Sequence, residues 1–267
     1  MGLEGLGPGG AEPFGQIGHH QPSTVQRVLA RDAIKPWQFR SWLYPRDLHF
    51  VEKANRVLDL YARIWNGQSL TNDEYVLSAD EKTSIQARRR RHPTQLAKPG
   101  EPARVEAEYT RCGATQYLAA LDVGIERVFG RCEAKTGKAP FDRLVDQVMS
   151  IEPYRSARRV FWIVDNGSSH RGWRAVKRLQ ERYPNLVLVH LPVHASWLNQ
   201  VEIYFSIVHR QLLTPADFPS VTALERQLLA FQDQYNRTAR PFGWRYTRSM
   251  LLAHLSRLKQ EITPLAA

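Results

Sequence analysis

The sequence has few cysteines, and the two present, Cys112 and Cys132, form no C-x-x-C pair. A structural zinc site built on paired cysteines is therefore not expected. Two unpaired thiols are instead typical of a protein in a reducing compartment. With 267 residues, the chain is long enough to bury a hydrophobic core, as one large domain or two small ones.

Long apolar runs are also missing, and none approaches the ~20 residues that a membrane-spanning helix needs. The N-terminal segment MGLEGLGPGGAEPFG lacks the basic start and the apolar core of a secretory signal. These two absences predict a soluble, cytoplasmic protein without membrane association.

Acidic residues are too few to balance the basic ones, because 26 Asp and Glu face 37 Lys and Arg, giving a formal net charge of +11. A charge of this size suits a polyanionic partner, and nucleic acid is the first candidate. A basic protein without such a ligand would have the same composition, so charge alone leaves both explanations open. Hydrophobic residues make up 43% of the chain, which indicates a globular protein.

The pattern of apolar residues divides the chain into four predicted regions. They are a disordered N-terminus, a helical segment, a main domain and a basic tail, at residues 1–22, 23–66, 67–236 and 237–267. The helical segment contains two predicted helices, at 23–32 and 51–65, in which apolar residues recur at helical spacing.

The main domain is predicted to combine strands and helices in one mixed sheet flanked by helices. Short apolar or alternating runs predict strands at residues 74–80, 104–111, 116–123, 126–134, 159–165 and 186–192. Runs with one apolar face predict helices at residues 141–150, 173–183, 199–213 and 220–236. Residues 112–115, CGAT, are predicted to form a turn, and Trp162 and Trp173 are expected in the core.

Asp165 ends the apolar run FWIV and is followed by NGSS and then a predicted helix. In open α/β sheets, functional sites form outside the carboxyl ends of strands. Asp-Asn-Gly is also ordinary turn chemistry, so Asp165 alone does not establish a site.

Two other acids occupy comparable positions. Asp80 ends the apolar run YVLSA, although an acid that simply terminates a strand would look the same. Glu202 lies in the first turns of the predicted helix 199–213, and Asn199 three residues before it also fits a capping box. Asp122 is a fourth acid, but it lies inside an apolar run and is ranked below the others.

The combination of the three acids is more informative than any one of them. Carboxylates suit hard divalent cations such as Mg²⁺, and two such ions about 3.5–4 Å apart support phosphoryl transfer. Clustered carboxylates repel one another without cations. We therefore predict Asp80, Asp165 and Glu202 as catalytic residues that bind two divalent metal ions.

The three acids lie in the segments LSADEKTSIQA, FWIVDNGSSH and LVLVHLPVHASWLNQVEIYFSIVHR. These segments resemble the DDE transposases of bacterial insertion sequences, in the group related to the mariner elements, and the resemblance extends over residues 24–245. It implies a ribonuclease-H-like α/β fold with a mixed five-stranded sheet in the order βββαβαβα. It also implies that the family's three acids are Asp80, Asp165 and Glu202.

The same resemblance implies the function. Members of this family use Mg²⁺ or Mn²⁺ to cut double-stranded DNA at the terminal inverted repeats of an element, and then join the freed end to target DNA. A homodimer assembled on DNA and a bacterial, nucleoid-associated location are expected. Four residues near the acids are expected to orient them, namely Asn166, His170, Ser196 and Asn199. Helix capping and turn formation would explain these four equally well.

The start of the chain departs from the family pattern. Members carry a helix-turn-helix region before the catalytic domain, and here only STVQRVLARDAIKPWQFRSW resembles its last part. A truncated or frameshifted gene is one explanation. Two alternatives to a transposase stay open: an idle DNA-binding protein, and another nuclease of the same fold, such as a junction resolvase.

Six arginines are predicted to contact DNA phosphates, namely Arg88, Arg89, Arg90, Arg91, Arg245 and Arg248. The first four form an unbroken basic run, which would also suit a solvated loop. The last two lie close to Trp244 and Tyr246. Such a mixture suits a backbone-binding surface, or equally a packed tail with a basic exterior.

Overall fold

The computed structural model describes residues 27, 47–167, 170, 172–215 and 217–262, and side chains as far as residue 258. The chain divides between Leu43 and Tyr44, and every element named below belongs to the second unit. The predicted disordered start and the helix at 23–32 lie outside the described residues, apart from Arg27, which is helical.

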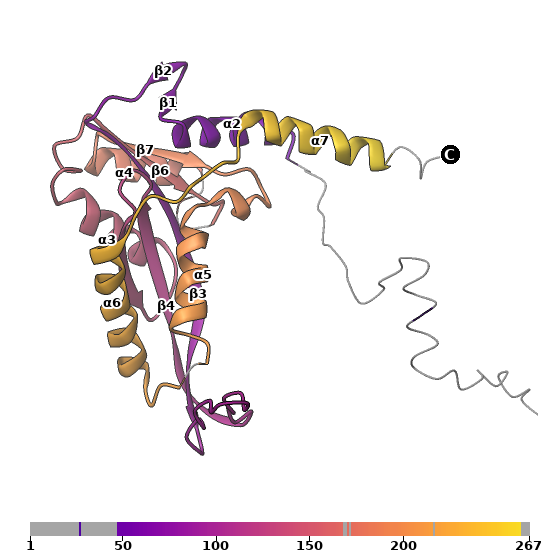
Figure 1. The fold of residues 1–267 in the computed structure, drawn as a ribbon. Helices are drawn as coiled ribbons and strands as arrows, with labels where there is room; N and C mark the ends of the chain where they lie inside the picture. The colour runs from indigo at the N-terminus through magenta and orange to yellow at the C-terminus, as the bar shows by residue number, and fades with distance from the viewer. Residues whose placement is uncertain (1–26, 28–46, 168–169, 171, 216, 263–267) are drawn as a thin grey trace, which may run out of the picture. The chain divides into compact units, whose positions relative to one another are not determined.

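Five strands form one mixed sheet in the order β5-β4-β3-β6-β7 (Figure 1). The strands are β3 (Glu74–Arg90), β4 (Tyr109–Asp122), β5 (Arg127–Glu133), β6 (Arg159–Val164) and β7 (Leu186–His190). β3, β4 and β5 pair antiparallel, whereas β6 and β7 continue the sheet in parallel with β3. This arrangement confirms the predicted five-stranded α/β fold.

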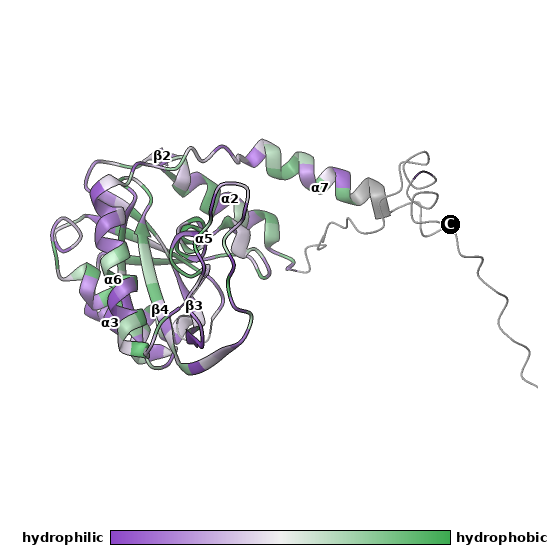
Figure 2. Ribbon diagram, turned by 60° about the horizontal axis from the view of Figure 1, so that its bottom comes forward, coloured by the Kyte–Doolittle hydropathy of each residue, from purple (hydrophilic) through white to green (hydrophobic). Residues whose placement is uncertain are grey.

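Helices cover both faces of the sheet and enclose three apolar clusters. They are α2 (Phe50–Tyr61), α3 (Lys138–Met149), α4 (Trp173–Arg182), a short 3-10 helix η1 (Ser196–Leu198), α5 (Val201–Gln211), α6 (Val221–Thr238) and α7 (Arg248–Ile262). One cluster packs α3 and α4 against the sheet, one lies beneath α2, and one lies beneath α5 and α6. In Figure 2, hydrophilic and hydrophobic residues alternate along α6, as expected of a helix with one face on a sheet. A small hairpin of β1 (Ile64–Trp65) and β2 (Gln68–Ser69) follows α2.

The first two strands of the sheet are much longer than predicted. β3 continues past Asp80 as far as Arg90, and β4 begins at Tyr109. The predicted strand 104–111 begins too early, and the predicted turn 112–115 is wrong, because these four residues lie inside β4, where Ala114 and Thr115 pair with β3. Beyond the helices these segments form a two-stranded ribbon, which backbone hydrogen bonds stabilise without a continuous apolar face. Apolar periodicity therefore gave no signal for it.

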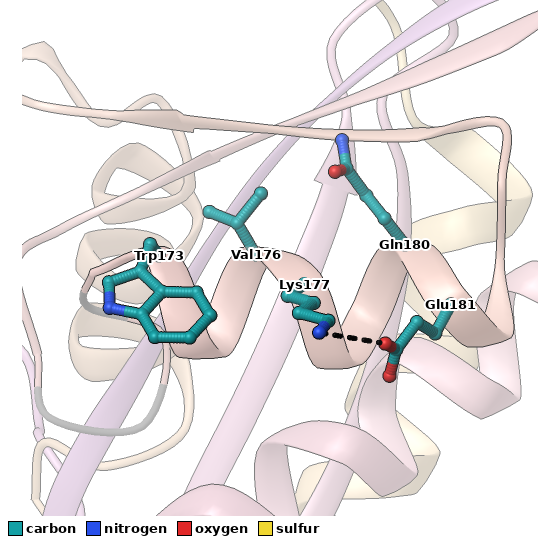
Figure 3. Close-up of a pocket in the computed structure, with 5 residues that line it drawn as sticks. All are labelled: Trp173, Val176, Lys177, Gln180 and Glu181. Atoms are coloured by element: carbon teal, nitrogen blue, oxygen red, sulfur yellow. Dashed lines mark ion pairs between the residues drawn. The ribbon is translucent and has the colours of Figure 1, made fainter.

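The prediction of a buried Trp162 is confirmed, but Trp173 is 69% exposed. Trp173 is the first residue of α4, and the buried side of that helix is formed by Ala175 and Leu179. Figure 3 shows the outer side of α4, where an open hollow of about 520 Å³ is lined by Trp173, Val176, Lys177, Gln180 and Glu181. None of the three predicted acids lines this hollow.

The C-terminal region is packed and partly helical, which favours the packed tail over the backbone-binding surface. Trp244 contacts Tyr61 of α2 edge to face, with ring centroids 5.2 Å apart. Tyr246 makes a similar contact with Trp197, also at 5.2 Å. Arg248 hydrogen bonds to Asp59 and so fastens the start of α7 to α2. No helix in the described part of the chain is long and apolar enough to cross a membrane.

Candidate active site

The register of two parallel strands brings Asp80 and Asp165 together. In this register Glu74 pairs with Arg159 and Ser78 pairs with Ile163. Continuing it by two residues places Asp80 opposite Asp165, which directly follows the last residue of β6. The prediction that Asp80 ends its strand is wrong, because β3 runs on to Arg90. β6 is the strand that stops here, so Asp165 follows its end at the level where β3 continues through Asp80.

A buried polar network joins the start of α5 to β3. The side-chain nitrogen of Asn199 donates hydrogen bonds to the carbonyl of Ala79 (3.0 Å) and to Oδ2 of Asp80 (3.1 Å). Its side-chain oxygen accepts a hydrogen bond from the hydroxyl of Ser78, and that hydroxyl accepts one from the backbone N–H of Val201 (2.9 Å). Glu202, the next residue, is thereby held beside Asp80.

This network also decides between two explanations for Asn199. The N-cap of α5 is Gln200, and no side chain caps the helix. The capping-box explanation is therefore wrong, because the side chain of Asn199 points to β3 and hydrogen bonds to Asp80. Sequence reasoning missed Ser78. Its hydroxyl group within the apolar run YVLSA was a usable signal, because a buried polar group needs a hydrogen-bond partner.

The other two acids act electrostatically on Asp80. Burial and the negative charges of Asp165, Glu202 and Glu81 together raise the pKa of Asp80 to about 7, against a hydrogen bond from the N–H of Glu81. Burial also raises the pKa of Glu202, and the charge of Lys82 opposes that effect. A carboxylate that is both half-buried and next to other acids is stabilised by a bound cation.

Asp165 is held by a histidine in the loop after β6. Nε2 of His170 lies 2.5 Å from Oδ1 of Asp165, and the same oxygen accepts a hydrogen bond from the N–H of Gly167 at 2.8 Å. The hydrogen bond from His170 is the main reason why the pKa of Asp165 is lowered. A Cβ at position 167 would lie 2.9 Å from Oδ1 of Asp165, so only glycine fits this turn without a shift.

His170 is buried, with only 1% of its side chain exposed, and it contacts both α3 and β7. Its ring packs against Phe141 of α3, with centroids 4.9 Å apart. Its carbonyl oxygen lies 2.7 Å from Nε2 of His190, at the end of β7. His190 was not predicted, and no sequence motif distinguishes it from the rest of the strand. The two histidines therefore connect Asp165 to the end of β7.

In the part of the chain that the structure describes, the side chains of the two remaining predicted residues, Asn166 and Ser196, do not contact the acids through hydrogen bonds. Asn166 donates a hydrogen bond to the carbonyl of Leu191 at 2.8 Å, which ties the loop after β6 to the loop after β7. Ser196 is exposed at the start of η1. Within the described residues, no hydrogen bond joins the side chain of either residue to Asp80, Asp165 or Glu202.

The donor set fits hard divalent cations. Three carboxylates from β3, from the loop after β6 and from α5 supply only oxygen ligands, as such cations prefer. Within the described part of the chain, no three Asp, Glu, His or Cys side chains lie close enough together to enclose one metal ion.

We predict that replacing His170 by Phe slows DNA cleavage by about 10- to 100-fold, the usual cost of losing a residue that orients a metal ligand. The Phe ring keeps the packing against Phe141 and removes the hydrogen bond to Asp165. Single-turnover cleavage rates, with thermal unfolding measured in parallel, check this expectation. His209→Phe, an exposed position on α5, is the matched control, and equal rates for both variants would contradict the role assigned to His170.

Comparison with known proteins identifies the family of the chain. The family model of the DDE superfamily endonucleases matches residues 75–225, a span that contains all three acids. No curated protein sequence is similar enough to count as a match.

Two similar solved structures are a Mos1 transposase paired-end complex with the left transposon end and a Mos1 mariner paired-end complex with Mn. They share 15% and 17% sequence identity with the chain, each with a TM-score of 0.50. The first match covers 89% of this chain and 76% of the other, and the second covers 82% and 64%. They confirm the ribonuclease-H-like fold, and the family match shows that the chain is a member of the DDE superfamily of endonucleases.

Proposed function

We propose that the chain is a DNA transposase in which Asp80, Asp165 and Glu202 bind two divalent cations, Mg²⁺ or Mn²⁺. The observation that supports this most directly is the placement of the three acids. The strand register puts Asp80 opposite Asp165, and Asn199 ties the start of α5, and with it Glu202, to Ala79 and Asp80. Family membership supports phosphodiester cleavage. The similar structures are complexes with a transposon end and with Mn.

Each element of the site has a task in this proposal. When bound, the cations activate the attacking oxygen and stabilise the leaving oxygen during phosphoryl transfer. Asp165, held by His170 and Gly167, presents its carboxylate in one orientation. Asn199 does the same for Asp80. Glu202 closes the site from α5, whose first turn also places the positive end of the helix dipole near the acids.

Incubating the protein with DNA that carries the terminal inverted repeats, in the presence of Mg²⁺ or Mn²⁺, tests this proposal. We expect strand breaks at the repeat ends, followed by joining of the freed ends to a supercoiled plasmid. Cleavage confined to branched DNA would instead identify a junction resolvase. Binding without cleavage would identify an idle DNA-binding protein, and either result would refute the proposed transposase.

The predicted DNA-binding arginines differ in whether their guanidinium groups already contact other residues of the chain. Arg88 lies over the ring of Tyr109 at 4.6 Å, Arg90 hydrogen bonds to the carbonyl of Glu106, and Arg91 pairs with Glu108 at 3.8 Å. Arg248 is bound to Asp59. The solvated-loop explanation is wrong for the first three arginines of the run, because they belong to β3.

Four of the six predicted arginines are exposed, namely Arg89, Arg91, Arg245 and Arg248. Arg91 and Arg248 are paired with acids, whereas among the described residues Arg89 and Arg245 take part in no ion pair and no side-chain hydrogen bond. Arg111, on β4 opposite Arg88, is also exposed. Like charges that face each other across two strands are destabilising, and a bound phosphate would relieve that repulsion. We propose that Arg89, Arg111 and Arg245 are the residues that contact the DNA backbone.

We expect the double variant Arg89→Ala, Arg111→Ala to bind duplex DNA more weakly and with less dependence on salt. Each lost phosphate contact lowers the slope of log affinity against log salt by about 0.9, so the slope should fall by nearly two. Fluorescence anisotropy over a range of NaCl concentrations measures both quantities. The exposed Arg155, which pairs with Glu152, supplies the control variant, and an unchanged slope in the double variant would remove the ribbon from the DNA interface.

The oligomeric state on DNA is also a proposal. We propose a homodimer on DNA, with residues 23–66 contributing to recognition of the repeat ends. Residues 47–66 contain α2 and β1, and α2 packs beneath the catalytic sheet.

A further inference from the structure

A lysine beside the three acids was not singled out by sequence. Lys82 follows Asp80 by two positions on β3, so the two side chains lie on the same face of the strand. On the neighbouring strand β4, Asp80 pairs with Ala119 and Lys82 pairs with Tyr117. Both partners belong to the apolar cluster beneath α5 and α6. Lys82 therefore lies on the side of the sheet where α5 presents Glu202.

The surroundings of Lys82 are acidic and apolar. Its ammonium nitrogen lies 5.9 Å from the ring centroid of Phe205 on α5. Its charge acts on Glu202, where it opposes the effect of burial. Among the described residues, Lys82 forms no ion pair. A half-buried ammonium without an ion-pair partner, at the edge of a carboxylate cluster, is suited to an anionic ligand.

A bulge in β3 ends the polar part of this face at Lys82. Three steps along β3, from Lys82 to Ile85, are matched by two steps along β4, from Tyr117 to Thr115. The extra residue reverses the alternation of side chains, so Ile85 and Ala87 lie on the face of Lys82 and are buried beneath the helices. Bulges beside active sites commonly reorient a side chain in this way.

The bulge is also held in a strained conformation. Ser84 has a φ of 54°, in the left-handed region, and its N–H donates a hydrogen bond to Oε1 of Gln116 at 2.8 Å. Such conformations persist only where surrounding contacts enforce them, and they cluster at functional sites. The strand thus maintains an irregularity that separates the acids and Lys82 from the ribbon.

We propose that Lys82 binds the scissile phosphate of DNA, through a hydrogen bond from its ammonium group to a non-bridging oxygen. This inference rests on the proposed function and adds a substrate-contacting residue to it. The three acids repel a phosphate, and a cation on the same face of β3 offsets that repulsion. Because charge builds up on the phosphoryl oxygens during transfer, the contact strengthens in the transition state.

Three variants separate charge from packing at this position. Lys82→Met keeps an unbranched side chain over Phe205 and removes the charge, whereas Lys82→Arg keeps the charge. Lys177→Met, at an exposed lysine of α4, is the control. Single-turnover cleavage of repeat-end DNA should be about 10- to 100-fold slower for Lys82→Met, as expected for a lost charged hydrogen bond. Lys82→Arg should recover most of the rate, Lys177→Met should match wild type, and all variants should unfold at similar temperatures.

A modified DNA locates the contact independently of activity. Affinity is measured with Ca²⁺ in place of Mg²⁺, for DNA in which a neutral methylphosphonate replaces the scissile phosphate. The modification should weaken binding by wild type clearly more than binding by Lys82→Met, because the interaction with Lys82 is already absent in the variant, whereas the attraction to Ca²⁺ is lost in both proteins. An equal loss in both proteins overturns the inference.

The other outcomes separate this inference from the proposed function. If Lys82→Met cleaves as fast as wild type while Asp165→Asn is inactive, the role of Lys82 is refuted and the proposed function stands. If the wild-type chain neither binds nor cuts DNA, the inference is refuted together with the proposed function.

Discussion

Replacing Asp165 by Asn is expected to slow DNA cleavage by on the order of 1,000-fold while leaving the protein folded. Metal ions contribute several kcal/mol to transition-state stabilisation, and a loss of about 4 kcal/mol corresponds to a roughly 1,000-fold slower reaction. Asn has the same shape as Asp but is a weak ligand for a hard cation. Rates of strand cleavage at saturating Mg²⁺, for wild type and variant side by side, measure the effect.

Asp122 supplies a matched control on the same sheet. Its carboxylate accepts hydrogen bonds from the hydroxyl of Tyr154 (2.7 Å) and from the N–H of Gly124 (2.8 Å). Those contacts assign it to the turn between β4 and β5, so Asp122→Asn should lower stability and preserve cleavage within a few-fold. Loss of cleavage in both variants would mean that the assay reports folding, and equal activity of wild type and Asp165→Asn would refute the enzymatic proposal.

Replacing Asp80 by Asn is expected to abolish cleavage and, without divalent metal, to stabilise the fold at pH 8. The pKa of this carboxyl is raised from 3.8 to about 7 by burial and by the neighbouring acids. Between those two values the folded chain keeps a proton that the unfolded chain has lost. The free energy of unfolding therefore falls as pH rises through this window and levels off above about 7.

A neutral Asn at position 80 does not titrate, so the variant does not lose unfolding free energy as the pH rises through this window. One unit of pKa shift corresponds to about 1.4 kcal/mol, and solvent screening at the half-buried Asp80 reduces the sum, so we expect a gain of roughly 1–2 kcal/mol. Thermal unfolding between pH 4 and pH 8, in EDTA, should show a declining midpoint for wild type and a flatter profile for the variant. Parallel profiles would show that the repulsion at Asp80 does not affect stability.

Divalent metal should reverse the order of stability. A cation that binds only the folded state stabilises it in proportion to the logarithm of its concentration above the dissociation constant. Adding Mg²⁺ or Mn²⁺ should therefore raise the unfolding midpoint of wild type and leave that of Asp80→Asn nearly unchanged. A metal response in the variant equal to that of wild type would exclude Asp80 as a ligand.

The order of elements and the positions of the acids could be predicted because both depend on local signals. Buried strands such as β6 appear as continuous apolar runs, and helices such as α5 appear as apolar residues at helical spacing. An acid directly after such a strand, as at Asp165, marks the edge of a sheet where sites form. These patterns were sufficient for most of the sheet and for its flanking helices, and they marked the three acids as candidate ligands.

The ribbon of β3 and β4 could not be predicted in the same way. Its strands are held by pairing with each other, and Gly113, at a φ of 102°, allows an irregularity that reads as a turn in the sequence. The exposed position of Trp173 depends on where α4 begins relative to the sheet, which helical periodicity does not specify. Both errors concern contacts between distant segments rather than local preference.

The surroundings of the acids were predictable only in part. The link from His170 to Asp165 spans five residues and could be anticipated from sequence proximity. The contact between Asn199 and Asp80 joins residues 119 positions apart, and the capping box offered a competing local explanation for Asn199. The position of Lys82 beside Glu202 depends on the packing of α5 over β3, which becomes visible only in three dimensions.

Anomalous diffraction from crystals of the protein soaked in Mn²⁺ tests the central claim most directly. The account predicts manganese peaks bounded by Asp80, Asp165 and Glu202, about 3.5–4 Å apart if two ions bind, and their loss in Asp165→Asn crystals. Peaks that lie elsewhere in the wild-type protein, or persist at this site in the variant, would contradict the assignment of these three acids as the metal ligands.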